Sequence, residues 1–125
     1  MDKKMLVIGM IALVSCAPVD THNLPGTYEA RVGGITEILV LRADGTYTVT
    51  QVGGRAHRGE WQALSRSRGC QRIILESFSS QIEDQGRPYI QSGEDWSTCV
   101  DKSIFGKTRI VMDADVGAYY IRQGG

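Results

Sequence analysis

Hydrophobic and polar residues alternate along much of the chain after residue 25, and this alternation predicts short β-strands. It is clearest where Tyr47, Val49 and Gln51 point to one side and the intervening threonines point to the other. The preceding Asp44-Gly45 pair is typical of a hairpin turn, because both residues accept the positive φ that such turns need. The predicted strands are Thr27–Arg31, Ile35–Arg42, Thr46–Val52, His57–Ala63, Cys70–Phe78, Trp96–Phe105, Thr108–Met112 and Ala118–Gln123.

The rest of the chain after residue 25 reads as turns and links. Ser65–Gly69 is expected to be a polar link, and Ser79–Asp95 is the least regular part, with a short strand expected around Tyr89-Ile90. No segment has a helical period of useful length. Short strands with turns every 8–12 residues or so predict an all-β fold, a single small antiparallel meander of about eight strands that forms a barrel or sandwich.

The first residues have a different pattern. Lys3 and Lys4 precede an apolar run from Met5 to Val14. A secretory leader has a positive start, an apolar centre of roughly 7–15 residues and small residues at its exit. A membrane-spanning helix needs roughly 20 apolar residues, so this run is too short. We therefore expect an exported protein with a signal peptide over residues 1–15.

Leu13-Val14-Ser15-Cys16 resembles the lipobox of bacterial lipoproteins, and all four positions fit that pattern. The resemblance implies cleavage before Cys16, which would then carry a diacylglyceryl thioether and an acylated amine. Ala17, in place of an Asp, implies transport to the outer membrane facing the periplasm. The inner membrane and a Gram-positive surface stay open, as does ordinary cleavage that leaves a free Cys16.

Removal of the leader would leave 125 − 15 = 110 residues, enough for one domain. We expect a lipidated tether over residues 16–25 and the β domain over residues 26–125. The mature chain would hold 14 − 2 = 12 basic and 14 − 1 = 13 acidic residues. This near-neutral charge argues against a nucleic-acid partner.

An exported chain with a lipidated Cys16 retains two further cysteines, Cys70 and Cys99. Exported proteins enter an oxidising compartment, where an even number of remaining cysteines is expected to form disulfides, here one between Cys70 and Cys99. The alternative is a pair of buried free thiols.

Three motifs near the start of the β domain follow one another: Gly26-Thr27-Tyr28, Leu39-x-Leu41-x-x-Asp44-Gly45-x-Tyr47 and Gly59-x-Trp61. Together they resemble the opening strands of small lipocalin-like lipoprotein domains, over residues 26–61. The resemblance implies an up-and-down meander with room for an interior cavity, and no particular ligand. The candidate ligand-binding residues are aromatic side chains of the predicted strands, which either line a cavity or form the packed core: Tyr28, Tyr47, Trp61 and Trp96.

Two groups of arginines lie near neighbouring predicted turns. If both turns lay at one end of a barrel, the arginines would form a basic rim able to bind phosphates or an acidic partner, because guanidinium matches phosphate geometry. The alternative is a set of solvated loop charges. The candidate rim residues are Arg55, Arg58, Arg66 and Arg68.

Catalytic and metal-binding motifs are weak. His22 and His57 are in no motif that brings a nucleophile, a base and an orienting carboxylate together. Asp113-x-Asp115-x-Gly117 is similar to the start of a calcium loop, but the later ligands do not follow, and a hairpin turn is the better interpretation. We expect no enzyme activity, no cofactor and no metal site.

These observations predict a membrane-anchored periplasmic lipoprotein whose β domain binds a small apolar ligand or an envelope partner. The alternative is an interaction or inhibitor module that blocks a wall-degrading enzyme or toxin through its loops. A cavity lined by Tyr47 and Trp61 would favour an apolar ligand. A filled core with an ordered Ser79–Asp95 loop would favour the interaction module.

Overall fold

A computed structural model describes residues 21–51, 53–67, 69–84, 87–88, 90 and 93–124. The expected signal peptide, the lipidation site Cys16 and the rim candidate Arg68 lie outside the described residues.

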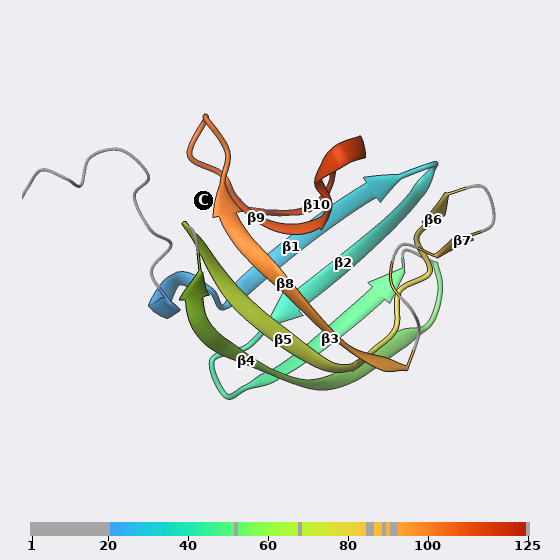
Figure 1. Cartoon of the computed structure of the whole chain (residues 1–125). Coiled ribbons are helices and arrows are strands. Elements are labelled where there is room, and N and C mark those ends of the chain that lie inside the picture. Colours follow the sequence, from blue (N-terminus) through green and yellow to red (C-terminus); the bar gives the residue numbers. More distant parts are fainter. Residues whose placement is uncertain are drawn as a thin grey trace, which may run out of the picture.

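Antiparallel strands form a closed eight-stranded barrel (Figure 1). Each barrel strand pairs with the next barrel strand along the chain, so that β5 pairs with β8. The last strand, β10, returns to pair with β1 through Tyr28 and Arg122. The predicted all-β meander of about eight strands is therefore confirmed. The barrel strands are β1 (Gly26–Val32), β2 (Ile35–Leu41), β3 (Thr46–Gln51), β4 (Ala56–Ser67), β5 (Cys70–Phe78), β8 (Glu94–Lys102), β9 (Thr108–Asp113) and β10 (Ala118–Arg122).

Most strand boundaries agree with the prediction to within a residue, but β4 and β8 differ. The expected link after Ala63 is instead the end of β4, where Arg66 pairs with Gln71 beyond a bulge. A bulge lets the strand bend and continue pairing through polar sequence. Strand β8 ends at Lys102 because the next residues form the turn to β9.

The long β5–β8 connection carries a small hairpin of its own. Its strands are β6 (Glu83–Asp84) and β7 (Arg87–Pro88), which lie before the Tyr89-Ile90 position where a short strand was expected. Tyr89 is outside the described residues, and Ile90 is buried at 5% exposure.

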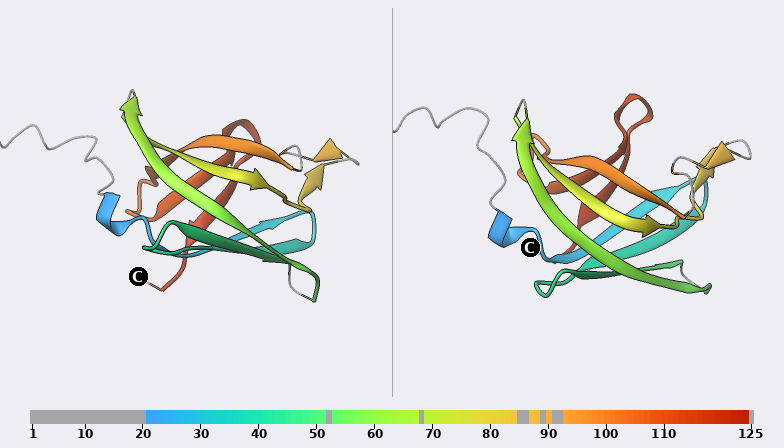
Figure 2. Two further views of the ribbon diagram at one scale, coloured as in Figure 1. Left: turned by 90° about the horizontal axis from the view of Figure 1, so that it is seen from below. Right: turned by 60° about the horizontal axis from the view of Figure 1, so that its bottom comes forward.

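Consecutive turns of an antiparallel meander alternate between the two ends of the barrel, so each end holds its own set of turns. The tether end, where the described chain begins, holds the short 3-10 helix η2 (Thr21–Asn23), the β2–β3, β4–β5 and β8–β9 turns and the end of β10. The far end holds the β1–β2, β3–β4 and β9–β10 turns and the β5–β8 connection. Figure 2 shows η2 and the C-terminal residues at the same end in both views.

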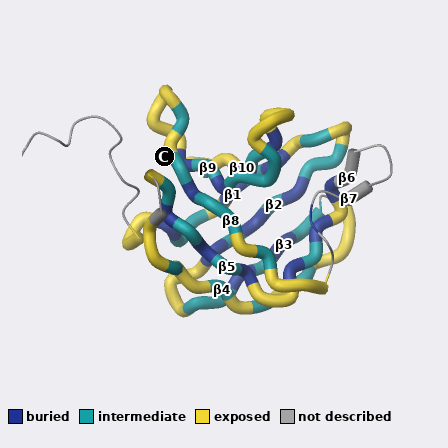
Figure 3. The backbone as a smooth tube through the Cα atoms, viewed as in Figure 1, coloured by how far each residue is buried: buried dark blue, intermediate teal, exposed yellow. Residues whose placement is uncertain are grey.

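Buried apolar residues of the barrel strands form one continuous core cluster, and Figure 3 shows the buried positions along these strands. Leu24, next to η2, is completely buried at the tether end, and its carbonyl oxygen accepts a 2.5 Å hydrogen bond from the Tyr28 hydroxyl. Ile82 and Ile90, from the β5–β8 connection, are buried in the same cluster at the far end. The barrel is therefore a packed core with a plug at each end.

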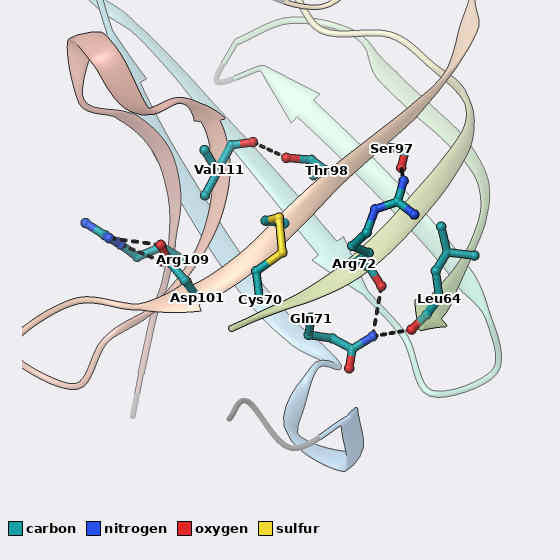
Figure 4. The surroundings of a disulfide bond; sticks show 10 residues. Leu64, Cys70, Gln71, Arg72, Ser97, Thr98, Asp101, Arg109 and Val111 are labelled. Atoms are coloured by element: carbon teal, nitrogen blue, oxygen red, sulfur yellow. Dashed lines mark hydrogen bonds and ion pairs between the residues drawn. A yellow bond between two sulfur atoms is a disulfide. The ribbon is translucent and has the colours of Figure 1, made fainter. Parts of the chain in front are cut away.

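A disulfide joins Cys70 of β5 to Cys99 of β8, as predicted (Figure 4). Pairing of Gln71 with Val100 places the two cysteines diagonally across neighbouring strands, with a Cα–Cα distance of 5.5 Å. On the chain-entropy model, closing a loop of 29 positions stabilises the fold by about 3.5 kcal/mol.

The turns predicted from short polar motifs are present. Asp44 Oδ1 accepts hydrogen bonds from the backbone N–H and the hydroxyl of Thr46, and Gly45 has a φ of 89°. Between β9 and β10, Asp113 caps the 3-10 helix η3 (Ala114–Val116), and Gly117 ends it in the left-handed conformation.

The glycine of the Gly59-x-Trp61 motif makes room for a tyrosine. Gly59 pairs directly with Tyr47 across β3 and β4, and a Cβ at Gly59 would lie 2.7 Å from the Tyr47 ring. The ring therefore lies against the β4 backbone, and its hydroxyl donates a 2.7 Å hydrogen bond to the Glu76 carbonyl oxygen.

Candidate functional site

The most unusual side chain of the barrel is a carboxylate in its interior. Glu37 is only 1% exposed and lies on the inner face of β2, in the same alternating row as Leu39 and Leu41. Glu37 is not among the candidates that the sequence motifs indicated, although the alternation of side chains along β2 points to it. Alternation along β2 places position 37 on the same face as the two leucines, and a charged residue on a core face calls for a specific environment.

Three donors satisfy this carboxylate. Its Oε1 accepts hydrogen bonds from the Ser80 hydroxyl, at 2.8 Å, and from the Tyr120 hydroxyl, while its Oε2 accepts from the Gln81 backbone N–H at 2.8 Å. Ser80 Oγ in turn accepts from the backbone N–H of Ile82 at 3.1 Å. Because two of these donors belong to the β5–β8 connection, Glu37 fastens the far-end plug to the wall of the barrel.

Electrostatics keep the Tyr120 phenol in its donor form. Burial raises the pKa of Tyr120 well above its ordinary value, and the negative charge of Glu37 raises it further. Tyr120 therefore stays protonated and continues to donate to Glu37 at any physiological pH.

A polar pocket of about 170 Å³ opens beside Glu37 at the far end. It is much smaller than the sites of roughly 300–1,000 Å³ that hold drug-sized ligands, and it suits a single side chain or a few waters. Strands β2 to β4, the β3–β4 turn and the β5–β8 connection contribute its lining residues, which are Glu37, Val49, Gln51, Arg55, Ala56, His57, Ser79 and Gln81.

His57 connects the pocket to the end of β5. Its Nε2 lies 2.6 Å from the carbonyl oxygen of Ser77, a residue with a φ of 49°. The Ser77 backbone N–H donates to Asp95 Oδ1 at 3.0 Å. The imidazole therefore helps to hold the point where β5 leaves the barrel.

The four arginines considered as one basic rim do not share an end. Arg55 lies in the β3–β4 turn at the far end, whereas Arg66 lies near the last residues of β4, at the tether end. Neighbouring turns of an antiparallel meander lie at opposite ends, so the condition for a common rim is not met. Arg55 lines the polar pocket, while Arg58 is an exposed residue of β4 and does not.

The four aromatic residues considered as ligand-binding are part of the core or pack against it. Tyr28 and Tyr47 are completely buried, and their hydroxyls donate to backbone carbonyl oxygens. Trp61 donates from Nε1 to the Arg42 carbonyl oxygen at 2.9 Å, and Trp96 packs against Phe78 with ring centroids 4.8 Å apart. None of the four lines the polar pocket.

Within the described part of the chain, no three His, Cys, Asp or Glu residues gather as metal ligands, and no helix is long and apolar enough to cross a membrane. No family model, curated protein or solved structure matches the chain.

Proposed function

We propose that this chain is an exported, lipid-anchored protein of the bacterial envelope, and that its barrel is a non-enzymatic interaction module. The module binds an envelope protein partner through its far end. The leader and the lipobox-like Leu13–Cys16 motif support the anchor. The Cys70–Cys99 disulfide supports export, because such bonds persist in oxidising compartments.

The packed interior is the observation that favours a partner over an apolar ligand. An eight-stranded barrel is just wide enough to be filled by its own side chains or to hold one small ligand. Here Tyr28, Tyr47, Phe78 and Tyr120 are all completely buried within one continuous cluster. An apolar ligand would have to displace this core, whereas a partner needs only the surface.

The far end has the properties of a protein-binding surface. Arg55, Gln51 and His57 all line the polar pocket, and these side-chain types together suit a carboxylate or amide side chain of a partner. Because Glu37 fastens the β5–β8 connection, the loop segments around the pocket are held in place before a partner arrives, which lowers the entropic cost of binding. Inhibition of a wall-degrading enzyme or toxin is one form that this function would take.

A binding role also agrees with how the titratable groups of the pocket are used. Glu37 accepts three hydrogen bonds that hold the plug, and His57 is bonded to the Ser77 carbonyl oxygen. Both groups therefore serve structural contacts, which supports binding over general acid–base chemistry.

The intact mass of the protein extracted from membranes tests the anchor. We expect a mature chain that begins at Cys16, carries acyl mass and gains about two hydrogens on reduction, as one disulfide requires. An unprocessed chain without acyl mass would remove the envelope location from the proposal.

Photo-crosslinking in intact cells tests the interaction. We expect p-benzoylphenylalanine in place of Gln81, at the pocket, to form a protein adduct, while the same group in place of Gln62, an exposed residue of β4, does not. Arg55→Glu should lower the adduct yield at position 81 at least about tenfold, since the loss of a charged hydrogen bond costs roughly 1.5–3 kcal/mol and about 1.4 kcal/mol is a factor of ten. Equal yields at both positions, or no protein adduct at position 81, would contradict binding at the far end.

A further inference from the structure

The turn between β8 and β9 exposes two large apolar side chains. Ile104 is 94% exposed and Phe105 is 87% exposed, the highest values among the large apolar residues that the structure describes. Lys102 and Lys107 flank the pair and are exposed too. We call residues 102–107 the apolar tip.

The apolar tip is a well-formed turn. The Ser103 backbone N–H donates to the Lys107 carbonyl oxygen at 2.8 Å, and Gly106 N–H donates to the Ser103 carbonyl oxygen at 2.9 Å. Ser103 Oγ also accepts from the backbone N–H groups of Phe105 and Lys107. The fold therefore presents the two apolar side chains to the outside on a closed hairpin.

Charge on the described residues differs between the two ends of the barrel. Exposed basic side chains outnumber exposed carboxylates at the tether end. The exposed carboxylates there are Asp44 and Glu60, which pairs in register with Thr46 beside the β2–β3 turn, and the carboxylate of Asp101 is paired with Arg109. The basic side chains there are Arg42, Arg66, Lys102 and Lys107. The far end carries four carboxylates, those of Glu94, Asp95, Asp113 and Asp115, and the basic residues Arg31 and Arg55.

The apolar tip also lies at the end where the chain enters the barrel. In Figure 1, η2 and the β8–β9 turn both lie on the left, opposite the β6–β7 hairpin. Thr21 follows Cys16 by five positions in the sequence (21 − 16 = 5). Even fully extended, they span no more than about 18 Å, so a lipid at Cys16 would keep the tether end close to the bilayer.

We propose that Ile104 and Phe105 insert into the interface of the membrane that holds the lipid anchor, while Lys102 and Lys107 contact lipid phosphates. This inference rests on the proposed anchor. Apolar side chains bordered by lysines suit the boundary between headgroups and acyl chains, where basic residues are attracted to anionic lipid. The barrel then stands with its tether end on the membrane, and the polar pocket faces away from it toward soluble partners.

Photo-crosslinking of the full chain in intact cells tests this orientation. We expect p-benzoylphenylalanine in place of Phe105 to form an adduct with the mass of a phospholipid. The same group in place of Val116, an exposed apolar residue of η3 at the far end, serves as the matched control and should form none. A protein adduct at position 105, or no adduct there, would overturn the proposal.

Charge reversal provides a second measurement. Lys102→Glu with Lys107→Glu should lower the lipid-adduct yield at position 105 about 30-fold or more, since each basic residue near an anionic surface contributes a factor of about five. Both lysines are exposed, so the variant should fold. An unchanged yield would contradict the contact of Lys102 and Lys107 with lipid phosphates.

The intact mass separates failure of this inference from failure of the anchor. Acyl mass at Cys16 without a lipid adduct at position 105 would refute the insertion alone. A chain without acyl mass would refute the anchor, whatever position 105 contacts.

Discussion

Replacing Glu37 with glutamine is the sharpest test of how the far-end plug is held. The carboxylate accepts from Ser80 and Tyr120 on one oxygen and from the Gln81 backbone N–H on the other. Glutamine keeps the shape but offers only one acceptor oxygen, so its NH₂ group must face a donor that the carboxylate had satisfied. At least one of the present hydrogen bonds is therefore broken: a hydroxyl that faces the NH₂ group can only accept from it, and its own proton is left without a partner. The other bonds lose their ionic component.

The magnitude follows from these contacts. A hydrogen bond to a charged group contributes about 1.5–3 kcal/mol, and a buried donor left without a partner costs a similar amount. Loss of one bond and weakening of two others should lower the free energy of unfolding by about 3 kcal/mol. With a urea m-value of about 1.5 kcal/mol/M, the unfolding midpoint would fall by about 2 M.

Urea unfolding and native-state hydrogen exchange measure this effect together. Besides the lower midpoint, we expect the amides of Gln81 and Ile82 to exchange about 100-fold faster, because 3 kcal/mol corresponds to about two powers of ten. Glu60→Gln is the matched control, since Glu60 is exposed on β4 and its change should stay within about 0.5 kcal/mol. If Glu37→Gln left both the midpoint and the two amides unchanged, the carboxylate would not be what holds the plug.

Three further predictions follow from the fold. Gly59→Ala should lower the free energy of unfolding in urea by about 3 kcal/mol, because its Cβ would lie 2.7 Å from the Tyr47 ring. In a Tyr47→Leu background the same substitution should lower it by less than about 1 kcal/mol. An equal loss in both backgrounds would rule out the clash. Cys70→Ser with Cys99→Ser should lower the unfolding free energy by about 3.5 kcal/mol under oxidising conditions, and unchanged stability would contradict the cross-link's role. Burial and neighbouring carboxylates raise the pKa of Tyr47 to about 12, and burial raises that of Tyr120 as well. Since the unfolded phenols lose their protons near pH 10 while the folded ones keep them, stability should fall as the pH rises from about 10 toward 12. A phenolate absorbance titration checks this, and release of every phenol proton near pH 10 in the folded protein would refute it.

Local patterns predicted most of the barrel. Alternation over Thr46–Gln51 put Tyr47 and Val49 inside, and the Asp44-Gly45 pair marked the hairpin before them, because side-chain direction in a strand and backbone freedom in a turn depend on a few neighbouring residues. Strand boundaries were less predictable where hydrogen bonding to a neighbouring strand extended a strand into polar sequence. The polar residues at the end of β4 form a strand because β5 offers them hydrogen-bond partners.

The candidate site depended on contacts that are distant in sequence. Position 37 was inside by alternation, but its partners lie 43, 44 and 83 residues away, so no local pattern could identify them. The separation of Arg55 from Arg66 follows from topology alone, since successive turns of a meander alternate between its ends.

By itself, the sequence determined that the folded region is a strand meander with glycine turns, and it indicated which two cysteines would pair, because both features arise from short-range preferences and residue counts. Only the tertiary structure decided that the interior is filled, that a buried carboxylate fastens the far-end plug and that Ile104 and Phe105 remain outside. The physical reason is that burial depends on which distant side chains meet when the barrel closes, and the free energy of those contacts is absent from any short stretch of chain.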